Sequence, residues 1–321
     1  MKKLSLLLVL ITFGQIHNNS HAGTWTRSES PFNFKLRLVT EFQSLPLVGE
    51  VSDKTIAWPA NHWDNINGGI AYRWTAVDSE SFSYQSPSFN TVRNYSTDQI
   101  SELSPAEKFS ILIGDYRYRL VKNVWSVTTP NDPYWNGICH GMAPASMHYG
   151  EPQTKTVINR AGIKIKFYSS DIKAMLAYYY ANIARTNSYY VGRRCNASEG
   201  TLAAQSNPDC SDLNPGSFHL VISNFIGLKG RPILADVDRY VEVWNQAALG
   251  YESYEVSEHA PTNSSAIGTV KRLRVQTSLK YTAAINRQLE AVIGTTDAYY
   301  LDESYDYYIE LDYRGRIIGG E

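Results

Sequence analysis

The chain has 321 residues, of which 43% are apolar and 19% are charged, and 31 Asp and Glu against 30 Lys and Arg leave a net charge of −1. This length and composition support a packed core in one large domain or two smaller ones, and they exclude a disordered or collagen-like chain. The balanced charge argues against a surface that gains affinity by neutralising phosphates, so no nucleic-acid partner is expected.

Residues 1–22 predict a signal peptide. Met1–Lys3 supplies a positive start, Leu4–Phe13 an apolar run of signal length, and Ser20–Ala22 a small-residue cleavage site. A membrane anchor would need roughly 20 apolar residues, whereas this run is broken from Gly14 onward. Because no later run is long and apolar enough either, the sequence predicts a secreted, extracellular protein without a membrane span.

The rest of the chain divides into two predicted parts. Residues 23–50 are weakly patterned, as expected of an N-terminal extension or a pro-segment. Residues 51–321 contain no linker, no repeat of 20 to 50 residues and no low-complexity block. We therefore expect this stretch to form one domain.

Two helices are predicted in the first half of that domain. The segment that begins at Ser104 has a capping serine, Pro105 at the first helical position and Glu107 in the first turn, and it should end before Gly114. A second helix should begin at Ser169–Asp171. Its apolar residues recur at helical spacing; they are Ile172, Met175, Leu176 and Tyr179.

The second half of the domain is predicted to form strands. Residues 218–222 and 233–237 are short apolar runs that we expect to pair as a hairpin, and 271–275 and 307–313 should form further strands. Helices that precede strands favour an α+β fold, with helices on one side of an antiparallel sheet.

The three cysteines separate into a pair and a single residue. Cys195 and Cys210 flank a polar stretch typical of a surface loop, and an exported protein usually pairs its thiols, so a disulfide between them is expected.

Cys139 stands apart, between Gly137 and Gly141. A thiol in the first turn of a helix has a lowered pKa because of the backbone dipoles, which favours the nucleophilic thiolate. Pro144 suggests that the regular helix starts only near Gly141.

A thiolate nucleophile also needs an imidazole and a group that orients the imidazole. Five histidines follow the predicted leader: His62, His140, His148, His219 and His259. His219 heads a predicted strand, and Asp236 and Asp238 lie on one face of the strand that should return beside it. This predicts a triad of Cys139, His219 and either Asp236 or Asp238.

Each member of this triad also has a structural interpretation. Cys139 could be a small buried apolar residue, His219 a core histidine, and the aspartates turn or surface carboxylates.

Several segments resemble the transglutaminase elicitor family, which is known from secreted oomycete enzymes and has marine bacterial relatives. The segments that carry the resemblance are Trp135–His140, Ala143–Ala145, Ser169–Ala174, Asn214–Leu220 and Val243–Gln246. The similarity extends from about Trp58 to Gly320, and Val243–Glu255 resembles the thirteen-residue piece that plants detect in those enzymes.

The resemblance implies a protein-glutamine γ-glutamyltransferase with a papain-like core, in which a helix bearing the cysteine packs on an antiparallel sheet bearing the histidine and the acid. It implies Cys139 as nucleophile, His219 as base and Asp236 as orienting acid, with Asp238 as the close competitor. Its partners would be proteins with accessible Gln and Lys side chains. Gly141–Met142 and Ala247–Ala248 depart from the family pattern, which puts in doubt an aromatic wall beside the thiol and recognition by plant receptors.

Calcium is the cofactor that the resemblance implies, although no known metal-binding motif is present. An acidic tract near the end could hold the ion, but alternating tyrosines favour a strand hairpin there; its acids are Asp302, Glu303, Asp306 and Asp312.

Two other functions stay open at this stage. One is a secreted cysteine protease or a glutamine deamidase that uses the same triad. The other is a catalytically silent effector that is recognised through Val243–Glu255.

Overall fold

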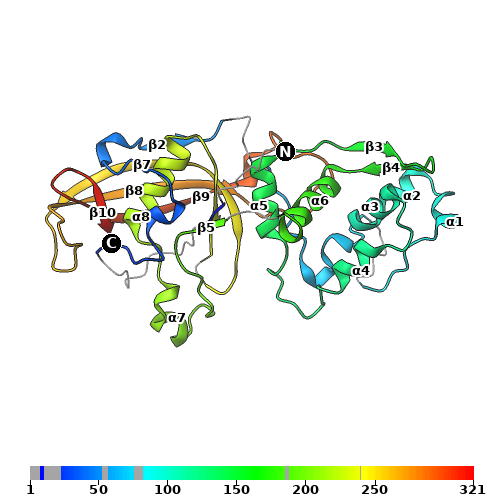
Figure 1. Cartoon of the computed structure of the whole chain (residues 1–321), viewed down its shortest axis with the longest axis horizontal. Helices are drawn as coiled ribbons and strands as arrows, with labels where there is room; N and C mark the ends of the chain where they lie inside the picture. Colours follow the sequence, from blue (N-terminus) through cyan, green and yellow to red (C-terminus); the bar gives the residue numbers. More distant parts are fainter. Residues whose placement is uncertain (1–7, 11–22, 53–56, 76–81, 185–187, 239) are drawn as a thin grey trace. The chain divides into compact units, whose positions relative to one another are not determined.

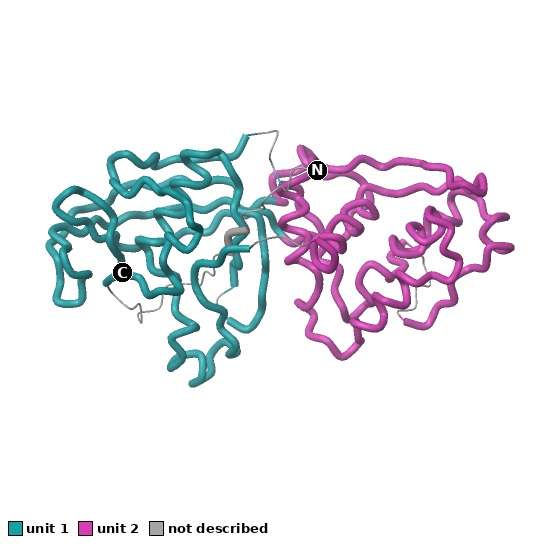
Figure 2. The backbone as a smooth tube through the Cα atoms, viewed as in Figure 1, with its two compact units in different colours: residues 1–57, 186–283, 300–321 teal, residues 58–185, 284–299 magenta. Residues whose placement is uncertain are grey.

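The computed structural model describes residues 8–10, 23–52, 57–75, 82–184, 188–238 and 240–321. The chain forms two compact units that alternate along the sequence (Figure 2). Unit 1 contains residues 1–57, 186–283 and 300–321, and unit 2 contains residues 58–185 and 284–299. Apart from Leu8–Leu10, the predicted signal peptide lies outside the described residues. The boundaries at residues 22 and 50 stay predictions.

Unit 1 is built on a six-stranded antiparallel sheet in the order β10-β9-β8-β7-β2, with β6 also paired to β7 (Figure 1). These strands are β2 Val48–Glu50, β6 Ile233–Asp236, β7 Asn245–His259, β8 Lys271–Thr282, β9 Tyr300–Leu311 and β10 Ile317–Gly320. A separate parallel pair joins β1 Leu8–Leu10 to β5 Ser188–Tyr190. The unit's α-helices are α7 Leu202–Ser206 and α8 Pro215–Ile222. The predicted strands at 233–237, 271–275 and 307–313 are confirmed.

The predicted strand at 218–222 is wrong, because these residues belong to helix α8. Asn214 caps the helix by accepting hydrogen bonds from the backbone N–H groups of Gly216 and Ser217, and Pro215 occupies the first helical position. The predicted hairpin is therefore absent, and β6 pairs with β7 instead. Helix α8 packs against β9 and β10, so His219 lies on a helix and not on the sheet.

The predicted disulfide between Cys195 and Cys210 is present. Its two half-cystines are buried against a small cluster that includes Ala204 and Tyr240. The intervening stretch was expected to be a loop, yet it contains α7, which begins after the capping side chain of Thr201. Cys139 is the cysteine outside this disulfide.

Unit 2 is mainly helical (Figure 1). Its helices are α1 Phe89–Val92, α2 Thr97–Ser101, α3 Pro105–Ile113, α4 Arg119–Trp125, α5 Cys139–His148 and α6 Ser169–Asn182. The unit also contains a short antiparallel hairpin of β3 Lys155–Ile158 and β4 Lys164–Phe167. Together the two units give the predicted combination of helices with an antiparallel sheet.

Both predicted helices are confirmed in unit 2. Helix α3 has the full capping box between Ser104 and Glu107 and ends at Gly114, which adopts a left-handed φ of 76°. Helix α6 begins at Ser169. Helices α5 and α6 pack closely, because a Cβ at Gly141 would lie only 2.1 Å from the Ala177 carbonyl oxygen.

Charged pairs are buried between the helices of unit 2. Lys108 of α3 and Asp171 of α6 form a 2.7 Å ion pair with both side chains fully buried. Lys173 pairs with Glu151 at 2.5 Å. The Glu151 carboxylate also accepts hydrogen bonds from the backbone N–H groups of Val292 and Ile293, which fastens the 284–299 segment to the unit.

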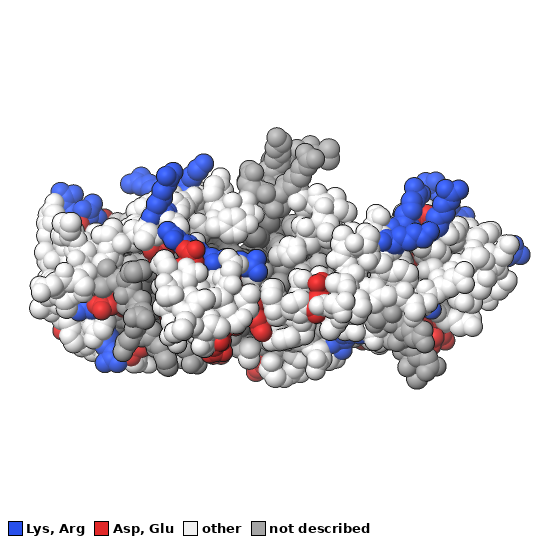
Figure 3. Space-filling model, turned by 90° about the horizontal axis from the view of Figure 1, so that it is seen from below, with Lys and Arg blue, Asp and Glu red and all other residues white. Residues whose placement is uncertain are grey.

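The charged surface is mixed in sign. On the face in Figure 3, basic and acidic side chains occur in several separate groups among uncharged residues. Within the described part of the chain, none of the helices has the length and apolar character needed to cross a bilayer.

Candidate active site

Cys139 is the first residue of helix α5 in unit 2, where its side chain is buried. The expected placement in a first helical turn is therefore confirmed. The expected start near Gly141 is wrong, because the helix begins at Cys139 and continues through Pro144. A thiol at this position lies at the positive end of the helix dipole, which favours the thiolate.

A second loop supports the segment that leads into Cys139. The backbone N–H of Ile138 donates to the His62 carbonyl at 2.8 Å, and the N–H of Asn65 donates to the Asn136 carbonyl at 2.8 Å. The Asp132 carboxylate accepts from the side-chain amides of both Asn65 and Asn136. No local sequence pattern predicts this support, because the paired residues are more than seventy positions apart.

Gly137 makes this close contact possible. A Cβ at Gly137 would lie 2.5 Å from the His62 carbonyl oxygen and 2.9 Å from its ring carbon Cδ2. Because real side chains do not approach so closely, only glycine lets the two loops meet here.

His219 is fully buried in α8 of unit 1. Its Nδ1 lies 2.9 Å from the Tyr307 hydroxyl, which in turn is 2.7 Å from the hydroxyl of Thr277. The His219 Nε2 has no hydrogen-bond partner among the described residues. Burial lowers the pKa of His219 to about 4, so the ring is neutral at ordinary pH.

Asp236 is the last residue of β6 and is also buried. Its carboxylate accepts hydrogen bonds from the backbone N–H groups of Trp244 at 2.9 Å and Asp238 at 3.4 Å. Burial raises the pKa of Asp236 to about 7, although these two hydrogen bonds oppose the shift. Burial also raises the pKa of Asp238.

The structure places the predicted triad in both units. Cys139 belongs to unit 2, whereas His219 and Asp236 belong to unit 1. Within unit 1, the hydrogen bond described for His219 goes to Tyr307, while those of Asp236 go to backbone N–H groups. Their joint action with Cys139 stays a prediction.

The segment Val243–Glu255 mostly forms the first part of strand β7. Its residues from Asn245 to Tyr251 are buried within unit 1, between neighbouring strands. Of two tryptophans in the segments that carry the resemblance, Trp135 is half-buried in unit 2, and Trp244 in unit 1 donates its indole N–H to Glu242.

The acidic tract does not fit a calcium site. Asp306 is engaged by Arg274 and Gln276 on the neighbouring strand, and Asp312 is engaged by Arg316. Among the described residues, no group of three or more His, Cys, Asp and Glu side chains is arranged to hold a metal ion. Calcium dependence therefore stays an expectation from the resemblance.

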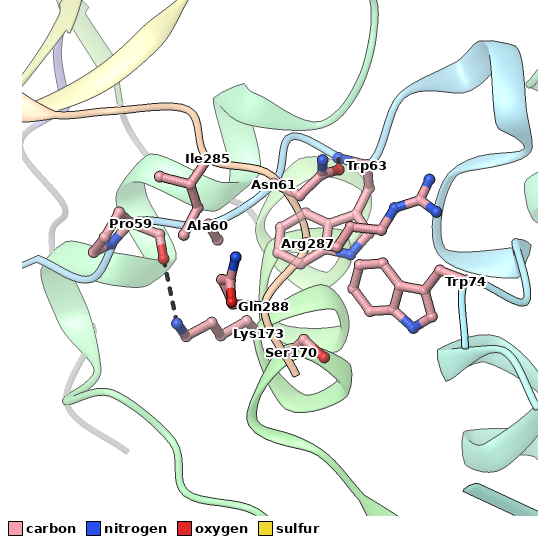
Figure 4. A pocket seen from close by; sticks show the side chains of 10 residues that line it. All are labelled: Pro59, Ala60, Asn61, Trp63, Trp74, Ser170, Lys173, Ile285, Arg287 and Gln288. Carbon is pink, nitrogen blue, oxygen red and sulfur yellow. Dashed lines mark hydrogen bonds between the residues drawn. The ribbon is translucent and has the colours of Figure 1, made fainter. Parts of the chain in front are cut away.

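A small pocket lies in unit 2 (Figure 4). Its lining residues are Pro59, Ala60, Asn61, Trp63, Trp74, Ser170, Lys173, Ile285, Arg287 and Gln288. Lys173 donates to the Pro59 carbonyl at 3.2 Å. The buried Trp63 indole N–H and Ser170 hydroxyl have no partner among the described residues.

Comparisons with known proteins place the chain in a family. A search of curated proteins finds no match. A search of solved structures finds similarity to the GP42 transglutaminase from Phytophthora sojae, with a TM-score of 0.64, 21% sequence identity, and coverage of 92% of this chain and 85% of that one. The family model described as transglutaminase elicitor matches residues 129–321, which include Cys139, His219 and Asp236. The protein thus belongs to the transglutaminase elicitor family.

Proposed function

We propose that this protein is a secreted protein-glutamine γ-glutamyltransferase with Cys139 as its nucleophile. The observation that carries the proposal is the placement of Cys139 at the first position of α5, within the segment matched by the transglutaminase elicitor family. The fold similarity to a solved transglutaminase supports it. Secretion is supported by the leader-like N-terminus and by the Cys195–Cys210 disulfide, which suits an oxidising compartment.

The reaction follows from thiolate chemistry on an amide. The Cys139 sulfur attacks the carboxamide carbon of a glutamine side chain, and the C–N bond breaks as the nitrogen takes a proton and leaves as ammonia. The thioester that remains is attacked by a lysine amine to give an isopeptide bond and the free thiol. Water in place of the amine gives glutamate. The backbone N–H of Cys139 and the Trp135 indole N–H are the proposed donors to the oxyanion.

In the predicted triad, His219 transfers the proton and Asp236 orients the His219 ring. In the structure Nδ1 of His219 faces the Tyr307 hydroxyl, so Nε2 is the nitrogen that would take the proton, and neither ring nitrogen is hydrogen-bonded to Asp236. The proposed reaction itself rests on Cys139 and does not depend on which imidazole serves it.

The test is incorporation of a fluorescent primary amine into a glutamine-bearing protein. The wild-type protein should label the acceptor, and Cys139→Ala should lower the rate by about 10³-fold or more. The Cys195→Ala/Cys210→Ala double variant is the matched control, because it also removes cysteines and should retain labelling.

Two results would overturn the proposal. One is peptide cleavage, or ammonia release without amine incorporation, which would identify a protease or a deamidase. The other is plant-elicitor activity that survives Cys139→Ala in a protein with no amine incorporation, which would identify a silent effector. Repeating the assay with a chelator tests the expected calcium dependence.

A further inference from the structure

One histidine of unit 2 is joined to the backbone that presents Cys139. The His62 carbonyl accepts from the N–H of Ile138, the residue immediately before Cys139. The ring Nε2 of His62 lies 3.0 Å from the Tyr134 carbonyl oxygen. Main chain and side chain of His62 thus contact the same short segment, at two places within five residues of the thiol.

The ring of His62 packs directly on this segment. The Cβ that Gly137 lacks would lie 2.9 Å from the His62 ring carbon Cδ2, so the ring covers the backbone two residues before Cys139. His62 is half-buried, and it can therefore meet both the protein interior and solvent. This partial burial contrasts with His219, whose side chain is fully buried.

The hydrogen bond of the ring fixes which nitrogen is basic. A carbonyl oxygen only accepts, so the bond to Tyr134 requires the hydrogen on Nε2 of His62. In the neutral ring, Nδ1 then carries the lone pair that can take a proton. Orientation of a catalytic imidazole through its second nitrogen is the usual function of the third member of a triad.

Backbone strain marks the same loop. Trp63, which follows His62, adopts a left-handed φ of 48°, a conformation rarely seen for a bulky residue. The Asn61 side chain accepts from the Trp63 N–H at 2.7 Å and supports this geometry. Such strain is concentrated at functional sites, because the surrounding structure must hold it in place.

The other histidines of unit 2 are less suited. His148 ends α5, about 13 Å along the helix from Cys139 at 1.5 Å per residue, and its Nδ1 is bonded to the Pro144 carbonyl. His140 follows Cys139 on the same helix, where successive side chains point about 100° apart. His62 approaches instead from a separate loop.

We propose that His62 is the imidazole that takes the proton from Cys139. Nδ1 of His62 accepts the thiol proton, which leaves a thiolate and an imidazolium, and the imidazolium later gives this proton to the departing ammonia. The second step, proton donation to ammonia, rests on the proposed function. The first step, proton transfer from Cys139 to His62, does not. On this proposal His219 is a structural histidine of unit 1.

The experiment measures alkylation of Cys139 by iodoacetamide as a function of pH, with the Cys195–Cys210 disulfide intact. A thiol with an ordinary pKa of about 8.5 is only about 0.3% thiolate at pH 6. We expect His62→Gln to slow alkylation at least about tenfold near pH 6 and by less than about twofold near pH 9. The control His148→Gln should keep the wild-type profile, and His219→Gln is measured beside it as the variant of the competing imidazole.

The substitution leaves the main-chain bond from Ile138 to residue 62 in place, and urea unfolding checks that each variant is folded. A folded His62→Gln with the wild-type profile, or a loss of thiolate in His219→Gln instead, would overturn the inference. Amine incorporation is measured in parallel. If the His62 dependence of alkylation is found without amine incorporation, the proposed function fails and the thiol–imidazole pair stands.

Discussion

In unit 2, charged groups are buried where helices meet, whereas in unit 1 a chain of neutral groups is buried where α8 meets the sheet. Lys108 and Asp171 are an ion pair with both side chains fully buried. His219, Tyr307, Thr277 and Ser253 instead form consecutive hydrogen bonds between neutral groups. The difference matters because a buried charge without its partner costs far more than a buried neutral group without one.

The ion pair should give the largest effect. Burial lowers the pKa of Lys108 and raises that of Asp171, so each charge depends on the other. Lys108→Met should therefore lower the free energy of unfolding by about 3–5 kcal/mol, measured by urea denaturation. The double variant Lys108→Met/Asp171→Leu should recover most of this loss. A single variant as stable as wild type would show that unit 2 tolerates an isolated buried charge.

In unit 1, two buried groups should make the free energy of unfolding depend on pH in opposite directions. The folded pKa of His219, about 4, is below its usual 6.5, so this residue contributes stability that is lost as pH falls through that window. The folded pKa of Asp236, about 7, is above its usual 3.8, so this residue contributes stability that is lost as pH rises toward 7.

The variants separate these two contributions. The free energy of unfolding should rise with pH between about 4 and 6.5 in Asp236→Asn, and it should fall over the same range in His219→Gln, by about 3 kcal/mol in each case. Urea unfolding at several pH values measures both slopes. If the free energy of unfolding changed with pH in the same direction in both variants, the opposed pKa shifts would be contradicted.

The smallest effect is expected for the hydroxyl of Tyr307. Tyr307→Phe removes the partner of His219 Nδ1 and of Thr277, and it should lower the free energy of unfolding by about 1–2 kcal/mol. Tyr313→Phe is the matched control, because Tyr313 is exposed and should change stability by less than about 0.5 kcal/mol. A loss comparable to that of Lys108→Met would remove the distinction between charged and neutral networks.

The local parts of the fold could be predicted from sequence. Helix α3 has its cap, its proline and its terminal glycine within eleven residues, and the Cys195–Cys210 disulfide follows from export and a short loop. The secondary structure of the apolar run at 218–222 could not be predicted from its local pattern, because a short fully buried helix and a buried strand have the same pattern. Asn214 and Pro215 were the available signals of a helix start.

The candidate site was predictable only in part. Cys139 and its helix were indicated by the flanking glycines and by the pairing of the other two cysteines with each other. The contact of His62 with Ile138 and Tyr134 depends on the tertiary fold, and it leaves no periodicity or spacing in the sequence. The sequence feature that permits this contact is the missing side chain of Gly137, and its meaning is clear only once the two loops are seen together.

The segment 284–299 has a consequence for the order in which the molecule is made. It leaves β8, is fastened to Glu151 in unit 2, and returns to β9 in unit 1. Unit 2 is therefore complete only after this late segment has emerged from the ribosome. Neither unit can be produced as one uninterrupted piece of the chain, and the helix that carries Cys139 gains its finished surroundings near the end of synthesis.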